Sequence, residues 1–207
     1  HIVYVKPKFD EADWLIYKSV NQKFANVVLE EVGSEKAFVF IQDYHFTLLP
    51  KMLKESRPDL LVAQFWHIPW PNREAFRICP WGQEILEGLL GNDLMGFHVQ
   101  YHCNNFLDTV DRNLESRIDY GKFTATKGGK TTHVRPFPIS IDFEELNLLS
   151  QEKDVENEMV RMKRELGLKG QIIGVGLDRV DYTKGIPERF KAIDRFLEKY
   201  PEYRNKF

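Results

Sequence analysis

Continuous apolar runs alternate along the chain with segments in which apolar residues recur every three or four positions. The runs predict strands at residues 37–41, 60–66, 94–97, 133–137 and 171–177. The helical spacing predicts helices at residues 13–31, 48–53, 81–90, 101–114, 152–166 and 187–200. Strands that alternate with helices indicate right-handed βαβ units, and hence a parallel sheet that is covered on both faces.

The same pattern gives three finer expectations. The strand at 37–41 is a continuous apolar run, which is typical of a strand buried on both faces, and 171–177 is a second strongly β-forming run. Residues 119–132 are rich in Gly, Lys and Thr and predict a hairpin or an exposed loop. The helix at 13–31 is expected to bury one face, formed by Tyr17, Val20, Phe24, Val27 and Val28.

A polar, helix-rich stretch separates two strand-containing parts. We therefore expect a first doubly wound domain at residues 1–142, an interdomain segment at 143–170, and the first strand–helix unit of a second domain at 171–207. The chain begins at His1 and ends at Phe207, directly after a predicted helix. We interpret it as the middle of a longer polypeptide.

Composition narrows the class of protein. Apolar residues make up 43% and charged residues 29%, which excludes a disordered or collagen-like chain. The net charge of −2 provides no positive field for nucleic acid or for an anionic membrane, and no apolar run approaches a membrane span. With no signal peptide at the start and only Cys79 and Cys103, we expect a cytoplasmic protein.

Polar side chains follow four of the predicted strands at the point where each strand ends. In open α/β sheets this carboxyl edge binds ligands, because loops and helix N-termini converge there. A polar residue must follow any buried strand, but the whole set favours a site. Its members are Asp43, His45, His67, His98, Asp178 and Arg179.

The segment from Asp178 to Gly185 points to phosphate. Arg179 and Lys184 precede a helix with Pro187 in its first turn, and Gly185 allows backbone N–H groups to approach an anion. The spacing is not that of a Walker loop. The alternative is a solvated Asp–Arg pair, with Lys184 as a helix-end charge.

The other polar positions allow several interpretations. Asp43 can accept hydrogen bonds from sugar hydroxyls or cap the following helix. Trp66 and Trp70 flank His67 and suggest a ring platform, although buried core aromatics are the commoner use. His98 and His102 have the spacing of a helical metal pair, but a strand–helix junction passes through them and no further ligand has clear spacing.

Eight short blocks carry a resemblance to a known family. Together they resemble the trehalose-6-phosphate synthases of glycosyltransferase family 20, over essentially the whole chain from about Asp10. These are retaining sugar-nucleotide glycosyltransferases with a GT-B fold of two Rossmann-like domains. The blocks lie at residues 40–45, 67–71, 76–77, 80–81, 84–91, 93–98, 137–139 with 141–142, and 178–187.

The resemblance implies a role for each candidate residue. Asp43, with Tyr44 and His45, binds the acceptor glucose 6-phosphate, and His67 faces the transferred glucose. Arg179 and Lys184, with Asp178 and Gly185, hold the diphosphate of UDP-glucose. His67, Arg179 and Lys184 are then the catalytic residues. The family needs no metal and no other cofactor, and the partners are a sugar phosphate and a nucleotide sugar rather than nucleic acid or membrane.

Some positions depart from the family pattern and leave alternatives open. They are Trp70, Asn72, Arg73, Ser140 and the loop at 119–132. The first alternative is a glucosylglycerol-phosphate synthase, and the second is a non-catalytic regulatory relative that binds sugar phosphate. A homo-oligomer and a fused or separate phosphatase also stay open. We expect residues 1–207 alone to be inactive.

Overall fold

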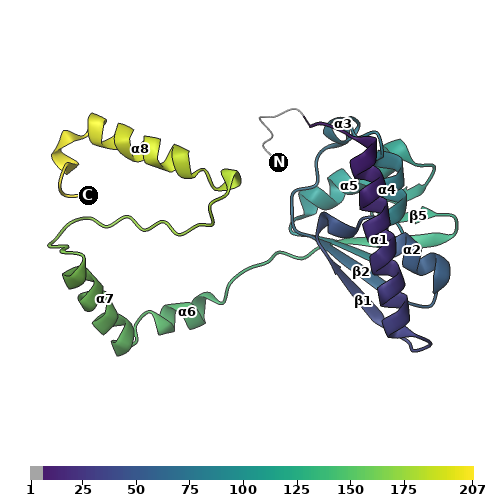
Figure 1. Cartoon of the computed structure of the whole chain (residues 1–207), viewed down its shortest axis with the longest axis horizontal. Helices are drawn as coiled ribbons and strands as arrows, with labels where there is room; N and C mark the ends of the chain where they lie inside the picture. The colour runs from purple at the N-terminus through teal and green to yellow at the C-terminus, as the bar shows by residue number, and fades with distance from the viewer. Residues whose placement is uncertain (1–6) are drawn as a thin grey trace. The chain divides into compact units, whose positions relative to one another are not determined.

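The computed structural model describes residues 7–207 and divides the chain into two compact units that meet between Ser140 and Ile141 (Figure 1). Each unit is described by itself. Among the described residues, no helix combines the length and the apolar character that a bilayer crossing requires.

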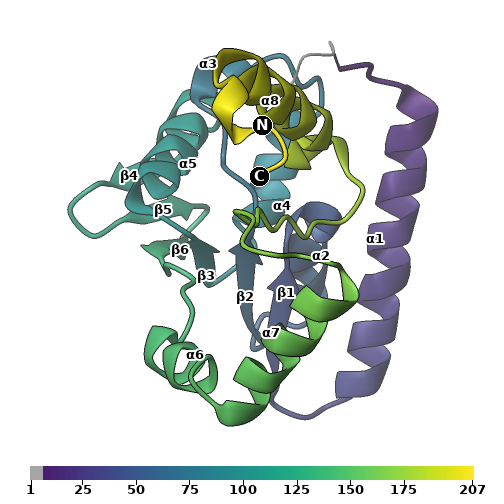
Figure 2. The same cartoon turned by 90° about the vertical axis from the view of Figure 1, so that its left-hand side faces the viewer.

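The first unit contains a six-stranded sheet with the order β1-β2-β3-β6-β5-β4 (Figure 2). Four strands are parallel: β1 (Phe38–Gln42), β2 (Leu61–Trp66), β3 (Leu94–Phe97) and β6 (Lys130–Pro136). The short strands β5 (Thr124–Lys127) and β4 (Arg117–Asp119) extend the sheet antiparallel. Of the two forms expected at 119–132, the structure has the hairpin, which turns at Gly128 and Gly129, both with positive φ.

The helices of this unit lie on one face of the sheet (Figure 1). They are α1 (Glu11–Val32), α2 (Leu49–Ser56), α3 (Arg73–Phe76), α4 (Gly82–Leu89) and α5 (Gln100–Asn113). The steps from β1 to β2 to β3 run in one direction, so right-handed crossovers place their helices on the same side. The expectation of coverage on both faces is therefore wrong for the described residues: Phe38 and Phe40 are 64% and 56% exposed.

The buried face of α1 also differs from the expectation. Val20, Phe24 and Val27 are exposed, and Trp14, Asn21 and Ala25 are buried. Apolar residues occur on several sides of this helix, so periodicity alone does not select the face that packs. Packing against α2 selects it instead: Asn21 Oδ1 accepts hydrogen bonds from the backbone N–H groups of Leu48 and Leu49, at 3.1 and 3.2 Å, where α2 begins.

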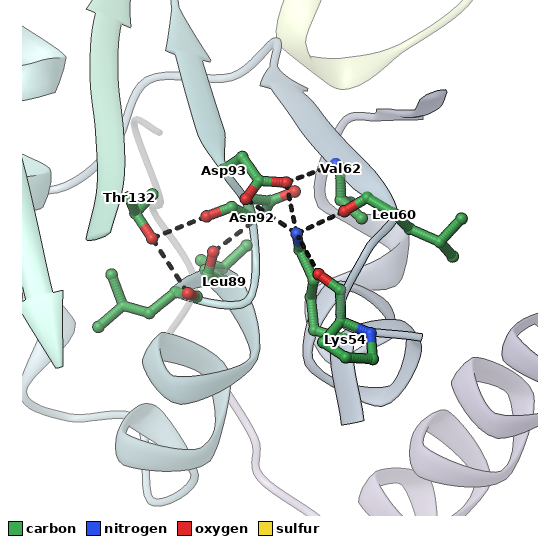
Figure 3. A network of polar contacts seen from close by, with 9 residues as sticks. Lys54, Leu60, Val62, Leu89, Asn92, Asp93 and Thr132 are labelled. Atoms are coloured by element: carbon green, nitrogen blue, oxygen red, sulfur yellow. Dashed lines mark hydrogen bonds and ion pairs between the residues drawn. The ribbon is translucent and has the colours of Figure 1, made fainter. Parts of the chain in front are cut away.

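A polar network holds the amino edge of the sheet (Figure 3). The buried Lys54 side chain pairs with Asp93 and donates to the carbonyl of Leu60. Asp93 Oδ2 accepts a hydrogen bond from the backbone N–H of Val62, at 2.8 Å. The start of β2 is thereby tied to α2 and to the residue before β3.

The second unit contains α6 (Phe143–Leu149), α7 (Lys153–Glu165), η2 (Tyr182–Lys184), α8 (Ile186–Lys199) and η3 (Pro201–Tyr203). The strand predicted at 171–177 is wrong: this segment is irregular, and Val175 and Leu177 are 90% and 95% exposed. A strand requires a neighbouring strand to complete its hydrogen bonds, and no other strand occurs among the described residues of this unit.

Candidate functional site

Asp43, His67 and His98 directly follow β1, β2 and β3, as predicted. These strands are parallel neighbours, so the three residues lie side by side at the carboxyl edge of the sheet. The Phe65 ring contacts both imidazoles edge-on, with centroid distances of 4.8 Å to His67 and 5.0 Å to His98. We call Gln42, Asp43, His67 and His98 the carboxyl-edge cluster.

Asp43 has an unusual backbone conformation. Its φ of 60° and ψ of −162° lie in a region that is essentially restricted to glycine. Three hydrogen bonds to β2 and its end hold it there. The backbone N–H donates to the Phe65 carbonyl at 2.7 Å, the carbonyl accepts from Gln64 Nε2 at 2.8 Å, and Oδ1 accepts from the His67 backbone N–H at 3.2 Å. Such strain is typical of functional sites.

The carboxylate of Asp43 does not cap the following helix. The 3₁₀ helix η1 (Tyr44–Phe46) receives no hydrogen bond from that side chain, which is directed to His67 instead. The helix-cap alternative is therefore wrong. Tyr44 and His45 are exposed beside Asp43, with their rings 4.4 Å apart.

The His67 imidazole is exposed, and its orientation is fixed by a neighbouring side chain. Nε2 lies 2.7 Å from Oε1 of Gln42, at the end of β1. Because of this contact we include Gln42 in the cluster. The sequence analysis did not identify Gln42 as a site residue. Because Gln42 Oε1 can only accept, His67 Nε2 is the donor in this contact.

The ring platform suggested for Trp66 and Trp70 is wrong. Both side chains are core residues, 7% and 1% exposed. Trp70 donates from Nε1 to Thr109 Oγ1 at 3.1 Å and stacks on Phe76. Alternation along β2 places Trp66 on the helix-covered face, so it cannot present its ring at the open edge.

The second unit contains the predicted phosphate-binding segment. Gly185 has a φ of 61° and forms the N-terminal boundary of α8, a conformation that glycine adopts without cost. Asp181 Oδ1 accepts hydrogen bonds from the backbone N–H and the hydroxyl of Thr183, both at 2.8 Å, and these bonds lower the pKa of the Asp181 carboxyl. The turn that carries Lys184 is thereby ordered.

The alternative interpretation of this segment, a solvated pair between Asp178 and the adjacent Arg179, is wrong. Asp178 pairs with Arg189 of α8 and not with the adjacent Arg179. Within residues 7–207, neither Arg179 nor Lys184 makes an ion pair. Both cations are exposed before the first turn of α8, where the helix dipole favours an anion.

His98 and His102 do not lie on one helix, so they do not form the helical metal-binding pair that their spacing allows. α5 begins at Gln100, so His98 lies outside the helix and its ring faces His67, 5.9 Å away. Burial lowers the pKa of His102. In the part of the chain that the structure describes, no group of three or more His, Cys, Asp or Glu residues is placed to hold a metal ion.

Comparison with known proteins identifies the family. The family model described as glycosyltransferase family 20 matches residues 1–207. The chain belongs to glycosyltransferase family 20. The family expected from the motifs is thus confirmed.

The similar curated proteins compared with this chain are trehalose-6-phosphate synthases. The trehalose-6-phosphate synthases of Mycobacterium tuberculosis H37Rv and Mycolicibacterium smegmatis are each 39% identical to this chain, over 95% and 96% of its length. The match covers 40% of each relative. The chain therefore spans about two-fifths of the length of these curated relatives.

Solved structures agree with the fold expected. The Escherichia coli protein bound with UDP-2-fluoro glucose has a TM-score of 0.80 at 30% identity, over 96% of this chain and 43% of that one. The α,α-trehalose-phosphate synthase of Burkholderia xenovorans in complex with glucose-6-phosphate has a TM-score of 0.81 at 28% identity, over 96% and 44%. The α/β fold of GT-B type is thus confirmed.

Proposed function

We propose that the protein transfers glucose from UDP-glucose to glucose 6-phosphate, with retention of configuration, and releases trehalose 6-phosphate and UDP. The observation that carries this proposal is the strained, triply held Asp43 beside His67 at the carboxyl edge of the sheet. The names of the relatives and the ligands named for two solved structures support it.

The acceptor half of the proposed site lies on the first unit. Asp43 Oδ1 accepts one hydrogen bond from the His67 N–H, which leaves Oδ2 and the second lone pair of Oδ1 to accept a hydroxyl of the acceptor sugar. Tyr44 and His45 are exposed next to it and line the same edge. His67, held by Gln42, faces the glucose that is transferred.

The donor half of the proposed site lies on the second unit. Arg179 and Lys184 bind the diphosphate of UDP-glucose, together with backbone N–H groups near Gly185 at the start of α8. Asp178, paired with Arg189, holds the segment that carries Arg179. In the reaction, the bond from the anomeric carbon to the diphosphate breaks and a bond to the acceptor oxygen forms.

The positive charges of Arg179 and Lys184 favour cleavage of the bond between the anomeric carbon and the diphosphate. The departing UDP gains negative charge, which Arg179 and Lys184 neutralise, and the acceptor hydroxyl proton passes to the departing phosphate oxygen. No enzymic nucleophile and no metal ion is needed in this scheme, because the two cations stabilise the leaving group. We propose that the protein acts in the cytoplasm.

The experiment is UDP release by the natural full-length polypeptide, measured with UDP-glucose and a panel of phosphorylated acceptors. We expect release with glucose 6-phosphate. Release with glycerol 3-phosphate instead would identify a glucosylglycerol-phosphate synthase. Binding of sugar phosphate without release of UDP would identify a regulatory relative and contradict the proposal. Residues 1–207 alone should release no UDP, because they span only about two-fifths of the length of the curated relatives.

A further inference from the structure

We propose that Gln64 is a positioning residue that holds Asp43 in its strained conformation and so orients the carboxylate toward the acceptor. The inference rests on the proposed function and adds to it a residue that contacts no substrate. Gln64 lies in the middle of β2, is 1% exposed, and interrupts an otherwise apolar strand. A buried amide is costly unless its hydrogen bonds are made, so its partners show what it does.

The carbonyl of Asp43 has no partner in the ladder between β1 and β2, because the last paired residues are Gln42 and Phe65. Its partner is Gln64 Nε2, at 2.8 Å. The N–H of the same residue is held by the Phe65 carbonyl at 2.7 Å. Both sides of the Asp43 backbone are therefore fixed by consecutive residues of β2, which is the over-determined setting that strained backbone requires.

A second buried amide, that of Asn92, fixes the orientation of Gln64. Asn92 Nδ2 donates to the Leu89 carbonyl and to Gln64 Oε1, both at 3.0 Å. Because a carbonyl can only accept, the nitrogen of Asn92 must face Leu89, and Gln64 must present its oxygen to Asn92. With its oxygen facing Asn92, Gln64 directs Nε2 toward the carbonyl of Asp43 and donates a hydrogen bond to it.

At the amino edge of the sheet, Thr132 Oγ1 donates to two backbone carbonyls, that of Asn92 at 2.8 Å and that of Leu90 at 3.0 Å, and not to the Asn92 side-chain amide that orients Gln64. Thr132 is buried like Gln64 but touches neither Asp43 nor the carboxyl-edge cluster. It therefore offers a matched control, since replacing it with valine removes a buried hydrogen-bond donor from the same sheet, while the Asn92 side chain keeps its hydrogen bonds to Leu89 and Gln64.

The test compares Gln64→Met and Thr132→Val in the full-length polypeptide, by UDP-release kinetics and by crystal structures of both variants. Methionine keeps the length of the glutamine side chain and removes both hydrogen bonds; Gln64→Leu serves if the methionine variant does not fold. We expect Gln64→Met to lower kcat/KM for glucose 6-phosphate by about 10–100-fold, with an unchanged KM for UDP-glucose. Thr132→Val should change neither value.

The crystal structures give a readout that does not depend on activity. In Gln64→Met, Asp43 should leave the positive-φ region, and in Thr132→Val it should stay there. The proposal is overturned if Asp43 keeps its conformation in Gln64→Met, or if acceptor kinetics fall equally in both variants. If the wild-type protein releases no UDP with any acceptor, the proposed function fails, and the φ of Asp43 still decides the role of Gln64.

Discussion

Asp43 combines a carboxylate suited to sugar hydroxyls with a backbone that only glycine adopts readily. The strain costs about 1–3 kcal/mol and is maintained by the contacts with β2. Backbone strain of this kind clusters at functional sites, which supports the role that we propose for Asp43. Replacement of Asp43 by glycine should therefore relieve the backbone strain and abolish activity, whereas replacement by alanine should abolish activity without relieving the strain.

Replacing Asp43 by glycine should give a more stable protein than replacing it by alanine, by about 1 kcal/mol or more. Both variants lose the carboxylate, but only glycine relieves the strain at positive φ. Urea unfolding measures the difference, and neither variant should transfer glucose. The control is Lys23, exposed within α1, where alanine should be more stable than glycine by about 1 kcal/mol. The same order of stability at both positions would contradict the assigned conformation.

Arg179→Ala and Lys184→Ala should each lower kcat for UDP release by about 10²–10³-fold, because each removes a positive charge from the leaving diphosphate. The exposed Lys191 of α8 supplies the control, since Lys191→Ala keeps both proposed diphosphate ligands. Steady-state kinetics with circular dichroism separates loss of catalysis from loss of fold. Unchanged turnover in Arg179→Ala would remove the diphosphate-binding assignment.

Among the secondary-structure elements, α1 and α2 are joined by polar contacts that periodicity does not reveal. Asn21 accepts from the first N–H groups of α2, and Arg57 links the end of α2 to the Gly33 and Glu35 carbonyls after α1. Arg57 also makes a bidentate contact with Asp59, with distances of 2.8 and 2.7 Å. These contacts fix the layer of helices that supports the strand ends.

Asn21→Leu should lower the free energy of unfolding by about 1–3 kcal/mol, because two buried N–H groups lose their acceptor. The neighbouring Gln22 is exposed, and its side chain donates a hydrogen bond to the exposed Asn26 of the same helix, so Gln22→Ala should stay within about 0.5 kcal/mol of wild type. Thermal and urea unfolding of both variants gives the comparison. Equal effects would show that Asn21 is not an anchor.

The Arg57–Asp59 contact predicts an acid-sensitive contribution to stability. The side-chain hydrogen bond from Arg57 lowers the pKa of Asp59 from 3.8 to about 2. Because the folded-state pKa is depressed, this stabilisation is present above 3.8 and disappears as the pH falls through about 2. Asp59→Asn should therefore be less stable than wild type near neutral pH, and the difference should shrink across this window. A difference that is independent of pH would contradict the assignment.

Sequence patterns located β3 and the residues that follow β1, β2 and β3, because parallel strands necessarily end at a common edge. They did not reveal Gln64 or Arg189, whose roles depend on which side chain lies opposite in space. The segment at 171–177 has the composition of a strand but lacks a neighbouring strand among the described residues. Local patterns cannot supply that neighbour.

At the scale of the whole molecule, the chain carries two sets of polar residues of different character on two units. The first unit offers a carboxylate and imidazoles, and the second offers a guanidinium and an ammonium near a helix N-terminus. In the reaction that we propose, the first set binds the acceptor and the second set binds the leaving diphosphate. The proposed transfer therefore requires both sets.

The most direct test is identification of the product that the full-length polypeptide makes from UDP-glucose and glucose 6-phosphate. Nuclear magnetic resonance should detect a non-reducing disaccharide phosphate in which both anomeric centres are α, with one UDP released per disaccharide. A product with inverted configuration at the transferred glucose, or UDP release without any disaccharide phosphate, would contradict the account.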